Sequence, residues 1–293
     1  MKKIFFTFLI TILYFTSYGQ ETPPPPPEKL TFESATYFHN VSANEVPRFI
    51  ELYKKFTDMS LIGEKRTITG EFLFRHWYGS GHTFVAYQQY ETMDDYHKDS
   101  GIINSNIRKQ IEATENKKEK EMLAKEWGEL RAFWDGHTDE IRGAYEKTAM
   151  LTIDNVDFDT PFVMSVGRYN SSGSMSKLGN AFFDWSIKPG VTKGTSIAGG
   201  VTYHYMGSGH EVEVWQCFNS LVDFAKAVST PSKEDRERLT FNGPLQSKPN
   251  ETTDEARKTF WSLVEGGHED QIYLHIGNVN LDKGIFDLAG EDR

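Results

Sequence analysis

Hydrophobic and polar positions predict the same order of secondary structure in two successive parts of the chain. Strands are marked by stretches rich in Val, Ile, Thr and aromatic residues, and helices by apolar residues three or four positions apart. The elements predicted in the first part are a strand at 31–41, a helix that begins at Ser42 or Asn44 and ends near Met59, strands at 67–78 and 82–90, a short helix from Thr92, a polar stretch at 117–121, a helix through Leu123 and Trp134, and a strand at 141–151. Those of the second part are a strand at 162–169, a helix at 175–187, strands at 197–206 and 210–218, helices near Ser220 and Asp254, and a strand at 272–279. Each part therefore has the order β-α-β-β-α-β.

Matching residues in the two parts indicate that the order arose by tandem duplication. Residues 76–98 align without a gap with residues 204–226, and both segments keep His, Gly-Ser-Gly-His, Gln, Asp and Lys in register. Residues 136–141 align in the same way with residues 267–272. Because glycine adopts positive φ at little cost, we predict tight hairpins at the two Gly-Ser-Gly segments, 79–81 and 207–209.

The order β-α-β-β-α-β is that of a ferredoxin-like repeat, an antiparallel sheet with both helices on one face. One such sheet leaves its other face bare, and two tandem copies can cover each other. The predicted fold class is therefore α+β, with two tandem ferredoxin-like repeats packed as an intramolecular α+β barrel. In element order and duplication the chain resembles the dimeric α+β barrel superfamily, which includes monooxygenases of antibiotic biosynthesis, NIPSNAP-like proteins and the chlorite dismutase group. The resemblance implies a barrel; a shared fold alone does not assign an activity.

The N-terminal sequence predicts export. Two lysines, a short apolar run and small residues at 17–19 are typical of a secretory signal peptide, so we expect a secreted or periplasmic protein. The expected domains are a signal peptide at 1–19, a proline-rich spacer at 20–30, repeats at 31–153 and 160–281, and a C-terminal tail at 282–293. No stretch of the mature chain is apolar for long enough to predict a membrane span. Cys217 is the only cysteine, so the fold has no internal disulfide.

The acidic composition restricts the partners. The formal charge is −10, and removal of Lys2 and Lys3 with the signal peptide makes it −12. This charge argues against nucleic acid and against an anionic membrane surface. A small-molecule ligand remains possible, and the oligomeric state is open.

Histidines mark the candidate site. In this topology the exit of the first strand, the hairpin and the start of the last strand lie at one end of each sheet. Six histidines are predicted to gather there: His76, His82, His137, His204, His210 and His268. If like ends of the two halves meet, His76 approaches His268 and His204 approaches His137, which would form two related sites. A three-residue hairpin loop would set His76 diagonal to His82, so that both share a metal, whereas a two-residue loop would put them on opposite faces.

Two further residue pairs belong to this candidate site. Strand alternation puts Gln88 on the face of His82 and Gln216 on the face of His210, among apolar residues. A buried amide must find hydrogen bonds, from a ligand or, in the structural interpretation, from a bridge between the halves. Likewise Asp139 and Asp270 either orient His137 and His268 through a ring N–H or fix the turn after a helix.

The preferred function is a small-ligand-binding protein that holds a partly apolar molecule in or at the rim of the barrel. The alternative is an oxidoreductase or monooxygenase-like enzyme with a histidine-bound metal or haem, or without a cofactor. A third possibility is a structural protein without a ligand. The sequence contains no phosphate-binding glycine loop, nucleophile elbow, paired cysteines or His-Glu-x-x-His motif, and it identifies neither a catalytic residue nor a cofactor.

Overall fold

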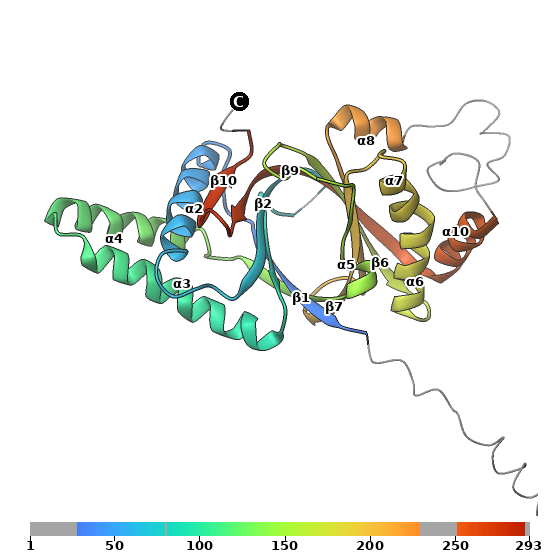
Figure 1. Ribbon diagram of the computed structural model, residues 1–293, viewed down its shortest axis with the longest axis horizontal. Helices are drawn as coiled ribbons and strands as arrows, with labels where there is room; N and C mark the ends of the chain where they lie inside the picture. Colours follow the sequence, from blue (N-terminus) through green and yellow to red (C-terminus); the bar gives the residue numbers. More distant parts are fainter. Residues whose placement is uncertain (1–27, 80, 229–250, 291–293) are drawn as a thin grey trace, which may run out of the picture.

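A computed structural model describes residues 28–79, 81–228 and 251–290. Its first half contains β1 (Leu30–Phe38), α2 (Val46–Ser60), β2 (Ile68–Tyr78), β3 (Phe84–Tyr90), α3 (Met93–Ala113), α4 (Lys117–Ala132) and β4 (Thr138–Tyr145). A linker follows with α5 (Glu146–Ala149) and β5 (Leu151–Thr152). The second half contains β6 (Val163–Ser171), α6 (Met175–Phe182), a π-helical turn η1 (Phe183–Ile187), α7 (Lys188–Thr192), β7 (Ala198–Gly207), β8 (Val212–Phe218), α8 (Leu221–Val228), α10 (Glu251–Leu263), β9 (Val264–Asn280) and β10 (Ile285–Leu288). The order β-α-β-β-α-β thus occurs twice (Figure 1).

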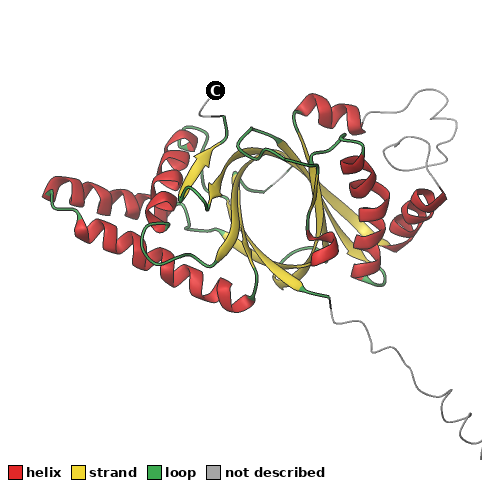
Figure 2. Cartoon of the chain, viewed as in Figure 1, coloured by secondary structure: helices red, strands yellow, loops and turns green. Residues whose placement is uncertain are grey.

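Eight antiparallel strands close into a barrel. The strand order is β9-β2-β3-β1-β4-β7-β8-β6, and β9 also pairs with β6, which completes the ring. Figure 2 shows this ring with helices on two opposite sides. Within each half the order is that of a ferredoxin-like sheet, and the halves join where β4 pairs with β7 and β9 pairs with β2. The predicted α+β class and the two-repeat barrel are confirmed.

Apolar side chains form three clusters that follow this architecture. One lies between the first half's sheet and its helices, around Phe49 and Phe84, and a second between the second half's sheet and its helices, around Trp185 and Phe260. The third fills part of the barrel interior and includes Tyr87 with other residues of both halves. Because the halves share this interior cluster, neither sheet has a core of its own on that face.

The helices of the first half differ from the prediction. The helix expected to be short, α3, runs from Met93 to Ala113. Helix α4 begins at Lys117, inside the stretch read as merely polar, because the side chain of Asn116 caps its first turn. Neither Ser42 nor Asn44 is the N-cap of α2, which is Glu45. The N–H of Ser42 donates to the Glu45 carboxylate at 3.0 Å, in a turn that precedes the helix.

The ends of the chain also add to the expectations. Strand β10 lies in the segment expected as a tail and pairs with β9, and its Phe286 packs on Tyr53 of α2 in the first half. The expected signal peptide and most of the expected spacer lie outside the described residues. Of the helices in the described ranges, none is both long and apolar enough to cross a membrane.

Candidate functional site

The six predicted histidines lie at one end of the barrel, which we call the histidine end. The register shows that like ends of the two halves meet, because Tyr78 of β2 pairs with Ile272 of β9 and Glu140 of β4 pairs with Gly207 of β7. Within each half, the same end holds the hairpin and the start of the last strand, as expected. The backbone placement of the histidines therefore follows the predicted topology.

The predicted contacts between histidines of different halves do not form. His76 lies opposite Tyr273 rather than His268, and His204 lies opposite Arg142 rather than His137. The last strand of the second half, β9, begins at Val264, eight residues before the predicted start. His268 therefore lies beyond the level of the hairpin in the first half. Bulges in both junctions shift the register further.

His76 and His82 lie together but are not arranged to bind a metal. Their rings stack with centroids 4.8 Å apart. Both ring nitrogens of His76 face backbone carbonyls, at 2.9 Å from that of His82 and 2.8 Å from that of Tyr78. Each nitrogen is therefore turned toward a backbone carbonyl and away from a position that it could share with His82 around a metal.

The hairpin register explains this arrangement. The N–H of His76 donates to the carbonyl of Thr83 and Arg75 pairs with Phe84, so the register is that of the two-residue loop and Tyr78 does not face His82. The opposite faces expected for that loop do not occur, because the ladder ends before His82. Strand β3 begins only at Phe84. His82 therefore turns into the barrel, where its Nε2 lies 3.0 Å from the Tyr273 hydroxyl. Burial, helped by His76 and Arg168, lowers the pKa of His82 to about 3, so the ring is neutral.

The barrel next to the histidine end is filled by buried ion pairs. Arg142 pairs with Glu140 and Arg168 pairs with Glu213, and all four side chains are at least nine-tenths buried. Arg142 also donates to Thr202 of the second half, and Arg168 donates at 2.8 Å to the hydroxyl of Tyr37 in the first half. His204 joins this network through Glu140, at 3.2 Å. These contacts at the histidine end therefore hold the two halves together.

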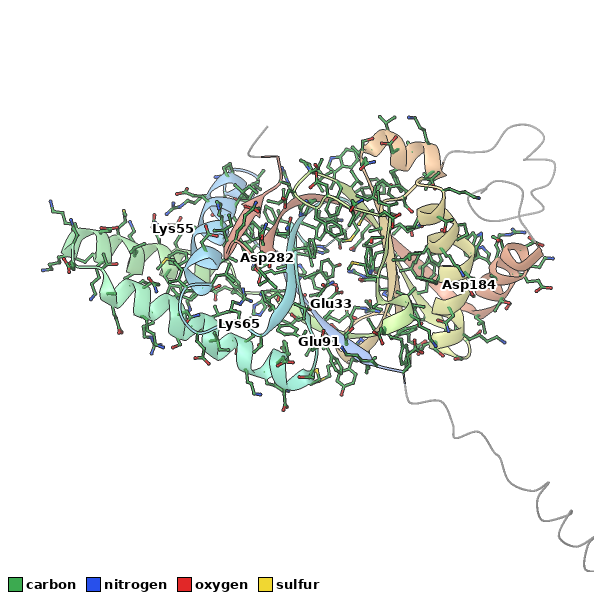
Figure 3. The ribbon with its side chains drawn as sticks, in the orientation of Figure 1. Glu33, Lys55, Lys65, Glu91, Asp184 and Asp282 are labelled. Atoms are coloured by element: carbon green, nitrogen blue, oxygen red, sulfur yellow. The ribbon has the colours of Figure 1, made fainter. Side chains whose placement is uncertain are left out.

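A small cavity lies toward the opposite end of the barrel. Its volume is about 40 Å³, enough for about three water molecules. It is lined by Glu33, Phe72, Phe74, Tyr87, Gln89, Met150, Phe158, Phe162, Met164, Glu213, Trp215 and Cys217, and none of the predicted site residues is among them. Figure 3 places Glu33 on the barrel wall. Burial, reinforced by the charge of Glu213, raises the pKa of Glu33 to about 8, so this carboxyl is protonated at neutral pH.

A much larger space, which we call the first-half cleft, lies on the outside of the barrel. It is bounded by the outer face of β1 and β3 and by helices α3 and α4, and its volume is about 620 Å³. Its lining residues are Ser34, Thr36, Phe38, Tyr53, Ala86, Gln88, Tyr90, Tyr96, His97, Asp99, Ser100, Ile103, Asn104, Trp127, Arg131, Trp134, Asp135, His137 and Asp139. Three of them, Gln88, His137 and Asp139, belong to the predicted site.

The cleft exists because α4 packs on α2 rather than on the sheet. Arg48 of α2 pairs with Glu126 and Glu129 of α4, and the Trp127 ring lies 5.1 Å from Phe56 of α2. Figure 1 shows α3 and α4 extending past α2, away from the barrel. One side of Trp127 is thereby left to line the cleft.

His137 and Asp139 form a hydrogen-bonded pair at one end of the cleft. His137 Nε2 lies 3.0 Å from Asp139 Oδ2, which agrees with one of the two alternatives that the sequence left open, and its Nδ1 faces the carbonyl of Trp134. The other carboxylate oxygen of Asp139 accepts from Thr36 at 2.8 Å. Both ring nitrogens of His137 therefore face acceptor oxygens, which fixes the orientation of the ring.

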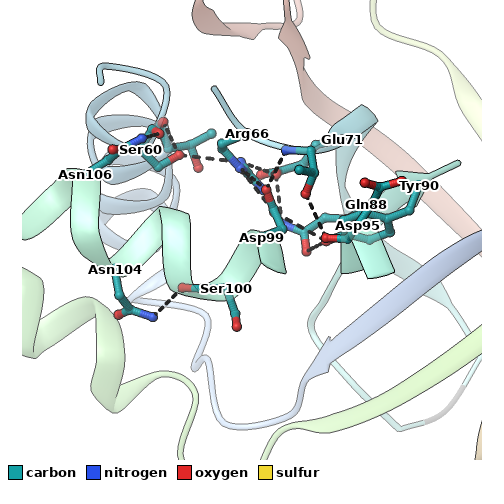
Figure 4. A network of polar contacts seen from close by, with 12 residues as sticks. Ser60, Arg66, Glu71, Gln88, Tyr90, Asp95, Asp99, Ser100, Asn104 and Asn106 are labelled. Carbon is teal, nitrogen blue, oxygen red and sulfur yellow. Dashed lines mark hydrogen bonds and ion pairs between the residues drawn. The ribbon is translucent and has the colours of Figure 1, made fainter. Parts of the chain in front are cut away.

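The other end of the cleft rests on three buried charges, which we call the inner cluster: Arg66, Glu71 and Asp99 (Figure 4). Arg66 bonds to Glu71 at 2.8 Å and to Asp99 at 2.6 Å. Burial by itself lowers the pKa of Arg66, but the charges of Glu71 and Asp99 outweigh it and raise that pKa. Sequence reasoning missed this cluster, because Arg66, Glu71 and Asp99 come from a loop, a strand and a helix with no common motif.

The corresponding space in the second half is filled. Trp185 is 3% exposed and Phe260 is 0% exposed, with ring centroids 5.5 Å apart, and they occupy the layer between sheet and helices. His268 pairs with Asp270 and stacks on Tyr169.

The predicted glutamine bridge between the halves is wrong. Each amide is bonded within its own half, Gln88 to Glu71 at 2.8 Å and Gln216 to Ser186 at 2.9 Å. Both glutamines lie on the outer face of the barrel, where only their own helices reach them.

Within the described ranges, no group of three or more His, Cys, Asp and Glu side chains is arranged to hold a metal ion. His76 and His82, the two histidines expected to be able to share a metal, face backbone carbonyls and a tyrosine hydroxyl instead. The site residues that the structure does bring together are those of the first-half cleft.

Comparison with known proteins supports the fold. No family model matches the sequence, and no curated protein matches it. Among solved structures, an anthrone oxidase-like protein is similar with a TM-score of 0.50 and 13% identity, over 91% of this chain and 96% of that one. A putative monooxygenase from Fusobacterium nucleatum has a TM-score of 0.51 and 5% identity, over 87% of this chain and 95% of that one. The chain has the fold of the dimeric α+β barrel proteins. Identities this low show the fold alone.

Proposed function

We propose that the protein binds a small, partly apolar organic molecule in the first-half cleft. The observation that carries the proposal is the volume of about 620 Å³, which falls within the range of about 300 to 1,000 Å³ typical of small-molecule sites. The barrel cavity, at about 40 Å³, is too small for such a molecule. The ligand class is the one expected from the sequence, but the site is on the outer face of one sheet instead of at the barrel rim.

The chemistry of the lining supports the same class of ligand. Six aromatic side chains provide apolar walls: Phe38, Tyr53, Tyr90, Tyr96, Trp127 and Trp134. Polar groups occupy the two ends, with His137 and Asp139 at one and Asp99 at the other. Eleven polar side chains also line the cleft, so it suits a ligand that combines an apolar body with polar groups.

Binding of a neutral fluorophore, N-phenylnaphthylamine, tests this proposal. Its fluorescence should rise on addition of the protein and saturate at one molecule per chain. Ile103→Trp, which places a larger ring inside the cleft, should weaken binding at least tenfold. Met122→Trp adds the same ring at an exposed position of α4 outside the cleft, and should leave the Kd unchanged. Equal affinity in the two variants would overturn the assignment of the site.

A second candidate function is oxidation of the bound molecule. The His137–Asp139 pair favours it, since a histidine oriented by a carboxylate can transfer a proton to or from a bound substrate. Two structural neighbours bear the names of an anthrone oxidase-like protein and a putative monooxygenase, which agrees with this candidate. Oxygen uptake with phenolic substrates should then fall in His137→Asn and persist in His268→Asn, the matched change in the filled half. Equal activity in both variants would dismiss the role of His137.

We also propose that the protein is exported, as its N-terminal sequence predicts. N-terminal sequencing of the protein recovered from the cell exterior or periplasm should begin at Gln20. Recovery of a chain that still begins at Met1 would dismiss the signal peptide.

A further inference from the structure

The inner cluster carries an unbalanced negative charge. Arg66 is 4% exposed, and Glu71 and Asp99 are each 1% exposed, so two carboxylates share one guanidinium away from water. Figure 4 shows how the three side chains converge. Among the contacts of the described residues, Arg66 is the only cation that touches either carboxylate.

The remaining partners of the cluster are neutral. Tyr53 and Gln88 both donate to Glu71 at 2.8 Å, and Asp99 accepts from the N–H of Thr67 at 3.1 Å. These donors satisfy carboxylate oxygens but do not cancel the charge. A buried charge without a counter-ion is costly, and a cation that reaches it relieves that cost.

The charged groups at the far end of the cleft are exposed to water. Asp139 hydrogen-bonds to His137 and is 46% exposed, and Arg131 and Asp135 are exposed as well. Water screens these charges, so the unscreened negative charge next to the cleft is concentrated at the inner end. Asp99, Tyr53, Tyr90 and Gln88 belong both to the lining and to the cluster or its partners, so this charge is next to the open space.

Aromatic rings surround the same space. The rings of Tyr90 and Tyr96 lie 5.5 Å apart in a T-shaped arrangement, and Trp127 and Trp134 face the cleft from α4 and the turn after it. Faces of Tyr and Trp attract ammonium groups, and several rings together recognise quaternary ammonium ions. A hydrated metal ion gains little from such walls, whereas an organic cation gains from both the rings and the carboxylates.

We propose that the ligand of the first-half cleft is an organic cation, an amine or quaternary ammonium group on a partly apolar body, with its charge at the Asp99 end. The inference rests on the proposed function, because it names the class of molecule bound at that site. It also agrees with the net charge of −10, which raises the local concentration of cations.

Calorimetric titration with a matched pair of probes tests this inference. Benzyltrimethylammonium and its uncharged carbon isostere, neopentylbenzene, have the same shape and differ in charge. The wild-type protein should bind the cation at least about tenfold more tightly than the isostere. Ile103→Trp should weaken both, which locates them in the cleft.

Variants that balance the charge of the inner cluster test whether this cluster causes the preference for the cation. Asp99→Asn and Glu71→Gln each leave one carboxylate for one guanidinium, and each should bring the two affinities to within about threefold of one another. Asp94→Asn, on the same helix but outside the lining, removes the same net charge and should keep the tenfold preference. If Asp99→Asn and Glu71→Gln both fold and both still prefer the cation tenfold, the ligand's charge does not lie at the Asp99 end of the cleft.

The wild-type comparison stands even if the cluster variants do not fold. Equal affinity for the two probes in the wild-type cleft would overturn the cation and leave the ligand-binding function intact. Failure of both probes and of N-phenylnaphthylamine to bind would overturn the proposed function itself.

Discussion

The two halves share one backbone plan and use the space between sheet and helices in opposite ways. In the first half this space is a cleft of about 620 Å³ whose floor contains Gln88. In the second half the matching glutamine, Gln216, bonds to Ser186 in a layer packed with Trp185 and Phe260. The strands therefore fix where a site can form, and the helices decide whether it stays open.

The barrel interior shows the same divergence. The register makes Glu33 the counterpart of Met164, because Ser34 pairs with Gln88 and Ser165 pairs with Gln216. One half thus places a carboxyl where the other places a thioether, and both side chains line the same small cavity.

Separating the halves should have the largest effect. A chain truncated to residues 20–154 loses the partners of β2 and β4 and exposes the interior cluster, so we expect it to aggregate or to show no cooperative unfolding. Circular dichroism and sedimentation measure this. A soluble, monomeric and cooperatively folded first half would contradict the shared core.

Removing one tryptophan from each helix layer should have unequal effects. Trp185→Ala deletes a ring that is 3% exposed and should cost about 3 to 5 kcal/mol of unfolding free energy. Trp127→Ala deletes a ring that already lines the cleft, and should cost about 1 to 2 kcal/mol, because fewer of its contacts are lost. Urea denaturation of the two variants gives both values. Equal losses would mean that the cleft is as tightly packed as the second half.

The pH dependence of stability tests the difference between Glu33 and Met164. The pKa of Glu33 is raised from 4.5 to about 8 on folding. The contribution of this carboxyl to the free energy of unfolding is therefore fully present below pH 4.5 and is lost as the pH rises through 8. Relative to Glu33→Gln, which stays neutral, the wild type should lose about 2 to 4 kcal/mol between pH 5 and pH 9. Glu33→Met places the residue of the second half at this position. Its free energy of unfolding should change with pH in the same way as that of Glu33→Gln. Parallel profiles for wild type and Glu33→Gln would contradict the buried neutral carboxyl.

Alanine substitutions in the two hairpins should show the smallest difference in stability between the halves, but a measurable one. Gly81 has φ +116° and open space around it, so Gly81→Ala should cost about 1 kcal/mol from backbone strain alone. The second hairpin has the predicted positive φ at Gly207, at +100°, and not at Gly209, where a Cβ would collide with the Glu140 carboxylate. Because Glu140 is held by Arg142, Gly209→Ala should cost about 2 kcal/mol. A smaller shift of the melting temperature in Gly209→Ala than in Gly81→Ala would contradict this.

The sequence predicted the parts of this molecule that duplication and strand alternation control. The strand order, the pairing of second and last strands between halves, and the His137–Asp139 pair all follow from local patterns. The direction of the His82 side chain could not be predicted in this way, because side chains alternate between faces only inside a strand and β3 begins at Phe84.

The first-half cleft was beyond sequence reasoning for a different reason. Its volume depends on α4 packing against α2, through Arg48 and Trp127, rather than on the sheet. Amphipathic spacing identifies an apolar face but not the element that it meets. The inner cluster likewise joins residues whose charges are brought together only by the tertiary fold.

The linker between β4 and β6 changes what evolution can do with this barrel. When two identical chains close such a barrel, every substitution occurs twice, and the two faces must remain alike. In a single chain each half accumulates its own substitutions, so one can keep an open cleft while the other becomes a packed support. The covalent link also holds the halves at a high effective concentration, so that dilution cannot separate them.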